Sequence, residues 1–191
     1  MAGIAGAGTA DERLVLLYLA LILATGGERF VELGVSARNA AWAFERGGVE
    51  FGQKHFPFMV VLHTAMLLAC LGEVFLLGRE FVPWLGWPML AIALASQVLR
   101  WWCIGTLGRR WNTRVIVVPG LPLVNRGPYR WFAHPNYVAV IAEGVALPLV
   151  YSAWITAVAF TAINLVLLLR VRIPVEETAL AFGLTQARQE S

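Results

Sequence analysis

The sequence predicts an all-α integral membrane protein with about five transmembrane helices. Hydrophobic residues make up 59% of the 191-residue chain and charged residues 14%, whereas a soluble domain has roughly 45–50% and about 25%. Several apolar runs approach the roughly 20 residues that a membrane-crossing helix needs. Thirteen of the fifteen Lys and Arg residues would also fall on one side of a five-span arrangement. These three observations predict a single multi-pass domain over residues 1–191.

The first span is the least regular part of the pattern. Residues 1–12 are expected to form a flexible tail, because they carry no signal-peptide pattern. The apolar run 14–25 is too short to cross a bilayer at about 1.5 Å per residue, so the helix should continue past Gly26-Gly27. Apolar residues recur at helical spacing over 30–44, with polar residues mostly off that stripe. We interpret this piece as interfacial.

The next spans are separated by short polar or turn-forming signals. Residues 58–78 and 81–99 form two apolar runs joined by Arg79-Glu80, which predicts a tight antiparallel hairpin. The run 137–169 is too long for one crossing, and Pro148 and Ser152 within it indicate a turn. We therefore expect a shorter fourth helix and a fifth from about Trp154 to Val171.

The longest polar segment, 100–136, contains six arginines interleaved with four tryptophans, as expected at a membrane interface. The segments after spans one, three and five together collect the thirteen basic residues. The positive-inside rule places that side in the cytoplasm and the N-terminus outside. A net charge of +3 gives no reason to expect a nucleic-acid partner. No obligate protein partner and no metal site is predicted, and Cys70 and Cys103 are interpreted as packing residues.

Two polar clusters flank the final apolar hairpin. Arg172 and Glu176 are four residues apart and share a helix face, while Pro174 between them predicts a distortion. They form either an interfacial pair that ends the fifth span or a ligand site. His134-Pro135 begins the fourth helix, where free backbone N–H groups can receive an anion. Tyr129 could stack on a ring or face a cation.

Several ionisable residues lie in apolar surroundings. His63, Glu73 and Glu143 are costly to bury in a membrane helix, so each either has a function or pairs within the bundle. His55 and Glu50 lie at the polar entry to the second span and could supply a general base.

The C-terminal motifs resemble those of a known enzyme family. LVNRGPYRWFAHPNY at 123–137, the apolar hairpin and RIPVEETAL at 172–180 together resemble the isoprenylcysteine carboxyl methyltransferase family. Its members are integral membrane enzymes that use S-adenosylmethionine. The resemblance covers roughly the C-terminal half and is specific because both parts occur in this order. Segments 49–68 and 109–124 are similar to a bacterial branch that methylates ring hydroxyls of alkylresorcinols and alkylpyrones.

The resemblance implies one methyltransferase domain, with a cofactor-binding core at 121–180 built from the last two helices and their flanking segments on the cytoplasmic face. It implies that Arg172 faces the methyl acceptor. The family usually has arginine before the His-Pro pair, where this chain has Ala133. The residues implied to contact S-adenosylmethionine are Leu121, Pro122, Leu123, Val124, Tyr129, His134, Pro135, Asn136, Tyr137 and Glu176.

The implied reaction transfers a methyl group to a lipophilic acceptor from the bilayer. A hydroxyl acceptor needs a base, for which His55 or Glu50 is available beside Arg172. A carboxylate acceptor needs only positioning by Arg172. The first hypothesis is O-methylation of an alkylresorcinol- or alkylpyrone-type lipid, and the alternative is carboxyl methylation of prenylcysteine. A non-catalytic membrane scaffold or transporter is the alternative of another class.

Overall fold

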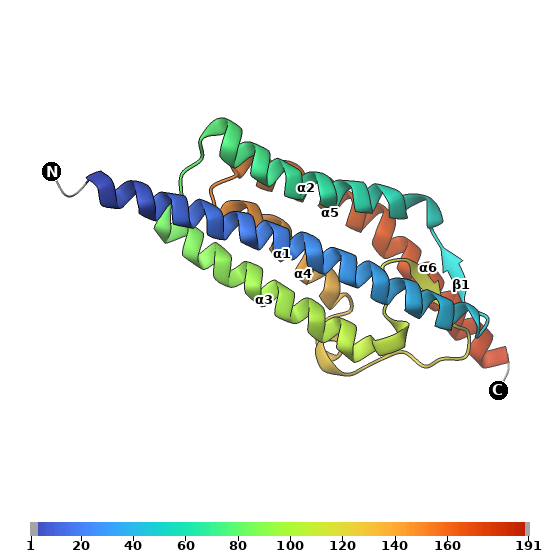
Figure 1. Cartoon of the computed structure of the whole chain (residues 1–191). Helices are drawn as coiled ribbons and strands as arrows, with labels where there is room; N and C mark the ends of the chain where they lie inside the picture. Colours follow the sequence, from blue (N-terminus) through green and yellow to red (C-terminus); the bar gives the residue numbers. More distant parts are fainter. Residues whose placement is uncertain (1–3, 190–191) are drawn as a thin grey trace.

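A bundle of long helices forms the molecule, and its two ends carry the two chain termini (Figure 1). The computed structural model describes residues 4–189. Four helices are long and apolar enough to cross a membrane, and α4 is a shorter apolar helix. The elements are α1 (Ile4–Phe44), β1 (Val49–Phe51), η1 (Gln53–His55), α2 (Phe56–Leu77), α3 (Pro83–Leu107), η2 (Gly108–Arg110), β2 (Val115–Val117), η3 (Gly127–Arg130), α4 (Pro135–Leu149), α5 (Trp154–Leu167), η4 (Leu168–Arg172) and α6 (Ile173–Gln189).

Helix α1 differs from its sequence-based description at its N-terminal end. It is helical from Ile4, so the part of the expected tail that the structure describes belongs to the helix, while residues 1–3 lie outside the described range. The piece expected to be interfacial is the unbroken continuation of α1 to Phe44. Ser36, Asn39 and Ala40 in this part of α1 are buried. Ser36 and Asn39 contact the segment that follows α3, at Asn112 and Trp111, and helical periodicity alone does not show such contacts.

The α2–α3 hairpin is confirmed, with a connection over residues 78–82. Glu73 near the end of α2 accepts hydrogen bonds from the backbone N–H groups of Ile155 (3.1 Å) and Thr156 (2.7 Å). It therefore caps the first turn of α5, where N–H groups have no partner within the helix. Arg79 completes the site, 2.9 Å from the same carboxylate. Of the two possibilities for Glu73, the structure shows pairing within the bundle.

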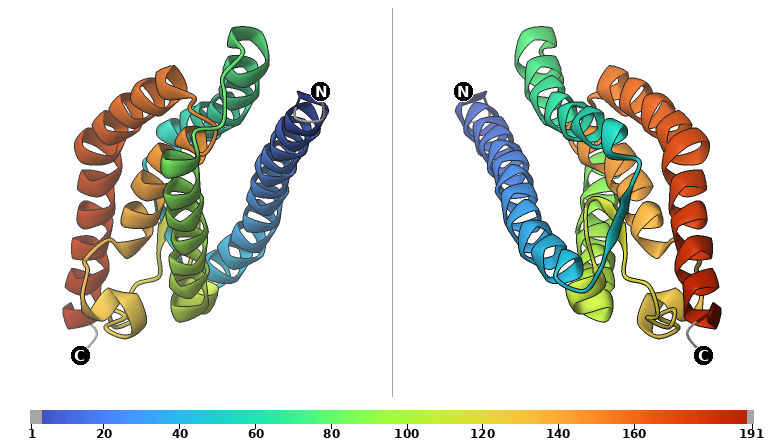
Figure 2. Two further views of the ribbon diagram at one scale, coloured as in Figure 1. Left: turned by 90° about the vertical axis from the view of Figure 1, so that its left-hand side faces the viewer. Right: turned by 90° about the vertical axis from the view of Figure 1, so that its right-hand side faces the viewer.

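The predicted turn between the fourth and fifth helices is also confirmed. Helix α4 ends at Leu149, and α5 begins at Trp154. Ser152 in this turn has a φ of 55°, in the left-handed region. The turn leaves α4 short and buried beside α3. Figure 2 shows α1 and the α5–α6 helix on opposite sides of the bundle, with α3 and α4 between them.

A buried group of charged residues joins α1 to α3 and α4. Arg29 on α1 lies 2.9 Å from Glu32 and 3.5 Å from Glu143 on α4. Arg100 on α3 contacts the same Glu143 and lies 3.6 Å from Glu32. Pairing of this kind is how charged side chains are accommodated inside a bundle. His63 likewise contacts its own helix, 2.8 Å from the carbonyl oxygen of Met59.

The distortion expected at Pro174 takes the form of a π-helix over Leu168–Arg172, directly before α6. Proline has no N–H to donate to the carbonyl of Arg170, and its ring excludes that carbonyl. Beyond it, the chain continues as the helix α6. Strands β1 and β2 form a small antiparallel ladder, in which Glu50 pairs with Ile116.

Candidate functional site

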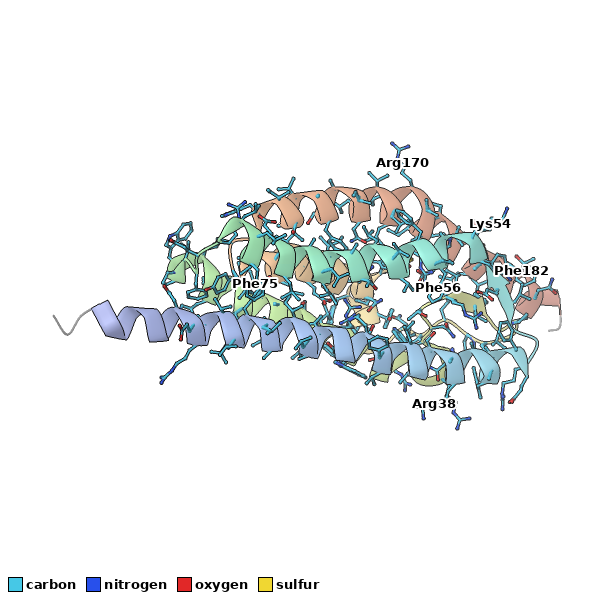
Figure 3. The ribbon with its side chains drawn as sticks, turned by 45° about the horizontal axis from the view of Figure 1, so that its top comes forward. Arg38, Lys54, Phe56, Phe75, Arg170 and Phe182 are labelled. Carbon is cyan, nitrogen blue, oxygen red and sulfur yellow. The ribbon has the colours of Figure 1, made fainter. Side chains whose placement is uncertain are left out.

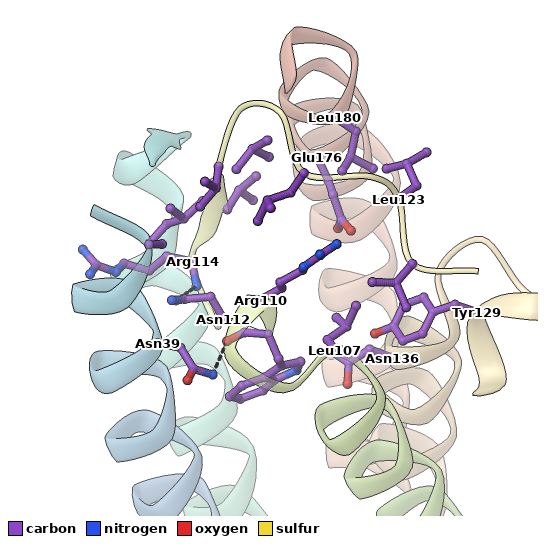
Figure 4. Close-up of a pocket in the computed structure, with 18 of the residues that line it drawn as sticks. Asn39, Leu107, Arg110, Asn112, Arg114, Leu123, Tyr129, Asn136, Glu176 and Leu180 are labelled. Carbon is purple, nitrogen blue, oxygen red and sulfur yellow. Dashed lines mark hydrogen bonds between the residues drawn. The ribbon is translucent and has the colours of Figure 1, made fainter. Parts of the chain in front are cut away.

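A cavity of about 650 Å³ lies at the end of the bundle where α6 begins. Its walls come from α1, the 107–125 segment, the η3–α4 region and the start of α6. This volume is within the range typical of small-molecule sites. Figure 4 shows side chains from α1, α3 and α6 converging on it. Sequence segments as far apart as Asn39 and Leu180 therefore contribute to one pocket.

Nine of the ten residues expected to contact a cofactor line this cavity, and the tenth, Pro135, is fully buried beside it. Gly127 places the η3 turn: its φ is 56°, and a β-carbon there would lie 2.5 Å from Thr106 Oγ1. Glycine is therefore required for the chain to pass this close to α3. The nine lining residues are Leu121, Pro122, Leu123, Val124, Tyr129, His134, Asn136, Tyr137 and Glu176.

Arg172 is the most constrained charge in the site. It is 5% exposed, and the π-helix that precedes α6 presents it to the cavity. Its Nε donates to the Tyr137 hydroxyl at 3.1 Å, and one terminal nitrogen donates to the Thr113 carbonyl at 2.7 Å. The other terminal nitrogen lies 3.2 Å from His55 Nε2. Three chain segments thus fix the guanidinium.

Tyr137 connects Arg172 to Glu176. Its hydroxyl accepts the hydrogen bond from Arg172 and donates one to the Glu176 carboxylate. The His134 ring stacks on Tyr137 with ring centroids 5.3 Å apart, and its Nδ1 lies 3.7 Å from Glu176. The Glu176 carboxylate raises the pKa of His134. Burial raises the pKa of Tyr129, so this phenol stays neutral.

The loop between α3 and β2 is held by α1. Asn39 donates to the carbonyls of Gly108 (3.1 Å) and Trp111 (2.7 Å), and Ser36 contacts Asn112 at 2.7 Å. These bonds place Arg110 so that it extends into the cavity toward Glu176 (Figure 4). Asn39 and Arg110 were not among the expected site residues. The polar residues Ser36 and Asn39 in this helical segment were the available signal.

The two candidate bases are placed outside the cavity. Glu50 lies behind its wall, with its carboxylate 3.1 Å from Arg114. His55 reaches the site only through Arg172, and its Nε2 accepts that contact when the ring is neutral. Gly52 is necessary for this position, because a β-carbon there would lie 2.7 Å from His55 Nδ1.

Two polar atoms beside the cavity have no hydrogen-bond partner among the described residues. They are His134 Nδ1 and Asn136 Oδ1, and both are buried. Buried polar atoms in proteins are nearly always paired with protein, water or ligand. Together with Glu176, these atoms add polar groups to a cavity whose wall also includes the apolar side chains of 121–124.

Comparison with known proteins identifies a family and two relatives. Residues 89–182, which include most of the cavity wall, match the model of the isoprenylcysteine carboxyl methyltransferase (ICMT) family. The chain is 40% identical over 154 residues to the Bacillus subtilis protein designated "Uncharacterized protein YpbQ", covering 80% of this chain and 90% of that protein. It is 26% identical over 156 residues to an "Uncharacterized protein" of Haemophilus influenzae, covering 80% and 88%. The chain therefore belongs to the isoprenylcysteine carboxyl methyltransferase family of membrane proteins.

Proposed function

We propose that the protein is an S-adenosylmethionine-dependent O-methyltransferase that acts on a lipophilic acceptor. The observation that supports this best is the linkage from Glu176 through Tyr137 to the buried Arg172. It joins a carboxylate suited to a cationic ligand to a guanidinium suited to an anionic oxygen. A methyl transfer needs both groups held in line, with water excluded.

The cavity fits S-adenosylmethionine by size and by chemistry. It offers the unpartnered His134 Nδ1 and Asn136 Oδ1 for a polar ligand, and the Glu176 carboxylate for a positive charge. The apolar segment 121–124 and the neutral Tyr129 ring provide a surface for a flat base or for the sulfonium. When bound, this ligand supplies an electrophilic methyl group.

The acceptor that we propose first is a ring hydroxyl of an alkylresorcinol- or alkylpyrone-type lipid. A carboxylate such as that of prenylcysteine is the second candidate, and one contact favours it: the Nε2 of neutral His55 is already engaged by Arg172. A neutral hydroxyl would have to compete with that contact to lose its proton, whereas an ionised acceptor needs only the charge of Arg172.

We also propose that the cavity faces the cytoplasm and that the N-terminus is outside. Arg38, Lys54 and Arg170 point away from the bundle in the half that contains the site (Figure 3). Arg109, Arg110, Arg114, Arg126 and Arg130 belong to segments at the same end. The positive-inside rule assigns such an end to the cytoplasm.

The test is methyl transfer by the purified protein in lipid nanodiscs. Isotope-labelled S-adenosylmethionine is supplied with either a pentadecylresorcinol or a farnesylated cysteine, and methylated lipid is measured by mass spectrometry. We expect saturable cofactor binding and labelled product from one acceptor. A protein without saturable binding would be a scaffold or transporter. Product from the farnesylated cysteine alone would overturn the ring-hydroxyl assignment.

A further inference from the structure

A basic and aromatic surface lies beside the end of α3, at the η3 turn. Arg126 precedes this turn and Arg130 ends it, and both side chains are exposed. Trp131 follows Arg130 and packs edge-to-face on Trp102 of α3, with ring centroids 5.8 Å apart. We call these four residues, together with the neighbouring Phe132, the η3 surface.

The backbone of the turn is held against α3. Pro128 is fully buried, and Arg126 donates a hydrogen bond to the Thr106 carbonyl at 3.4 Å. A β-carbon on Gly127 would lie 3.2 Å from the Nε1 atom of Trp102. Because the turn is fixed in this way, Arg126 and Arg130 present their charges at a defined place on the outside of the protein.

No carboxylate of the described chain balances these two charges. The sequence has no Asp or Glu between Glu80 and Glu143, and no described residue forms an ion pair with Arg126 or Arg130. The buried Arg100, by contrast, pairs with Glu143. A guanidinium presents its N–H donors in a planar fork that matches the oxygens of a phosphate. The two exposed arginines are therefore suited to a phosphate-bearing partner.

The aromatic residues place the η3 surface at the membrane–water boundary. Trp131 is 63% exposed and Phe132 is 52% exposed, and tryptophan rings gather at the headgroup level of a bilayer. The turn lies beside the last two turns of α3, a helix that is long and apolar enough to cross a membrane. Arg126 and Arg130 therefore lie at the level of the lipid phosphates.

We propose that the η3 surface binds the headgroup of an anionic phospholipid in the leaflet at this end of the bundle. The lipid phosphate lies between Arg126 and Arg130, and the Trp131 ring lies against the glycerol and the upper part of the acyl chains. A soluble phosphate ester fits this surface less well, because the exposed rings of Trp131 and Phe132 would then stay in water.

This lipid lies beside the main cavity and does not enter it. Tyr129, between the two arginines in sequence, lines the cavity, whereas neither Arg126 nor Arg130 is part of the cavity wall. The bound phospholipid is accordingly an anchor that fixes the depth of the η3 turn in the bilayer. The proposal does not depend on the reaction that the main cavity supports.

Native mass spectrometry of the full chain in detergent, titrated with phosphatidylglycerol or with phosphatidylcholine of the same acyl chains, measures this binding directly. We expect phosphatidylglycerol to bind at least about tenfold more tightly. Arg126→Gln combined with Arg130→Gln should weaken phosphatidylglycerol binding about thirtyfold, which corresponds to about 2 kcal/mol for two arginines near a lipid surface. Arg126→Lys combined with Arg130→Lys keeps the charge and should restore most of the affinity.

The matched control is Arg38→Gln combined with Arg170→Gln. It removes the same charge from exposed arginines that point away from the bundle (Figure 3). We expect its affinity for phosphatidylglycerol to stay within about threefold of wild type, and the melting temperatures of both glutamine variants to match wild type. An equal loss of affinity in the two glutamine variants would show a general charge effect and overturn the site. Equal binding of the two lipids by wild type would overturn the anionic headgroup, and displacement of the lipid by glycerol 3-phosphate would show a site for soluble phosphate esters instead.

Discussion

Glu176→Gln is the sharpest test of the proposed cofactor site. The substitution keeps the shape of the side chain and removes its charge, so the hydrogen bond from the Tyr137 hydroxyl can still be accepted by the amide oxygen. What is lost is the attraction of the carboxylate for a cationic ligand and for His134, whose Nδ1 lies 3.7 Å away.

The size of the effect follows from the exposure of this side chain. A charge-assisted hydrogen bond contributes roughly 1.5–3 kcal/mol. The Glu176 side chain is 32% exposed, so solvent screening places its contribution in the lower part of that range. About 1.5–2 kcal/mol corresponds to a Kd for S-adenosylmethionine that is roughly 10–30 times higher.

Isothermal titration calorimetry on protein in nanodiscs measures this change directly. Glu177→Gln is the matched control, because that side chain is 66% exposed and lies 4.0 Å from His134. We expect it to alter the Kd by less than about threefold, as for an exposed charge. Wild-type affinity in Glu176→Gln would refute the placement of the cofactor beside this carboxylate.

Two further predictions concern α6 and the start of α4. Pro174→Ala restores an N–H that can bond within the helix, which favours an α-helical register over the π-helix and rotates Arg172 away from Tyr137 and His55. We therefore expect kcat to fall while the melting temperature is unchanged or higher. An unaltered kcat would contradict this role of the π-helix. Glu176 raises the pKa of His134 in the folded protein. The stabilisation that protonated His134 provides is therefore fully present below its unfolded pKa of about 6.5, and it is lost as pH rises through the folded pKa. The difference in melting temperature between wild type and His134→Asn should therefore shrink from about pH 6 toward about pH 8.5, and a difference that grows with pH would refute the reasoning.

Local sequence patterns accounted for the helices and their connections. The turn at Pro148 and Ser152, the α2–α3 hairpin and the distortion at Pro174 were all predictable, because each depends on the chemistry of a few adjacent residues. The short β1–β2 ladder was not predicted, since three-residue strands such as Val115–Val117 have too few positions to show a period. The helix over residues 30–44 was predictable from its apolar spacing, but the burial of Ser36 and Asn39 against the rest of the protein was not.

The residues of the main cavity were identifiable by their motif, but their partners were not. Nothing in the sequence pairs Asn39 with the carbonyl of Trp111, Glu73 with the start of α5, or Glu50 with Arg114. Each of these contacts joins segments at least 60 residues apart, and such pairings are determined by packing rather than by periodicity.

The sequence by itself determined that this is a multi-pass helical membrane protein with two polar clusters flanking its last apolar hairpin. Those properties follow from hydropathy, arginine distribution and turn chemistry, which act locally. Only the tertiary structure decided what the clusters contact: it fixed Arg172 between Tyr137, Thr113 and His55, and it put Glu50 behind the cavity wall. The physical reason is that a buried charge takes its position from the partners that the whole fold brings to it.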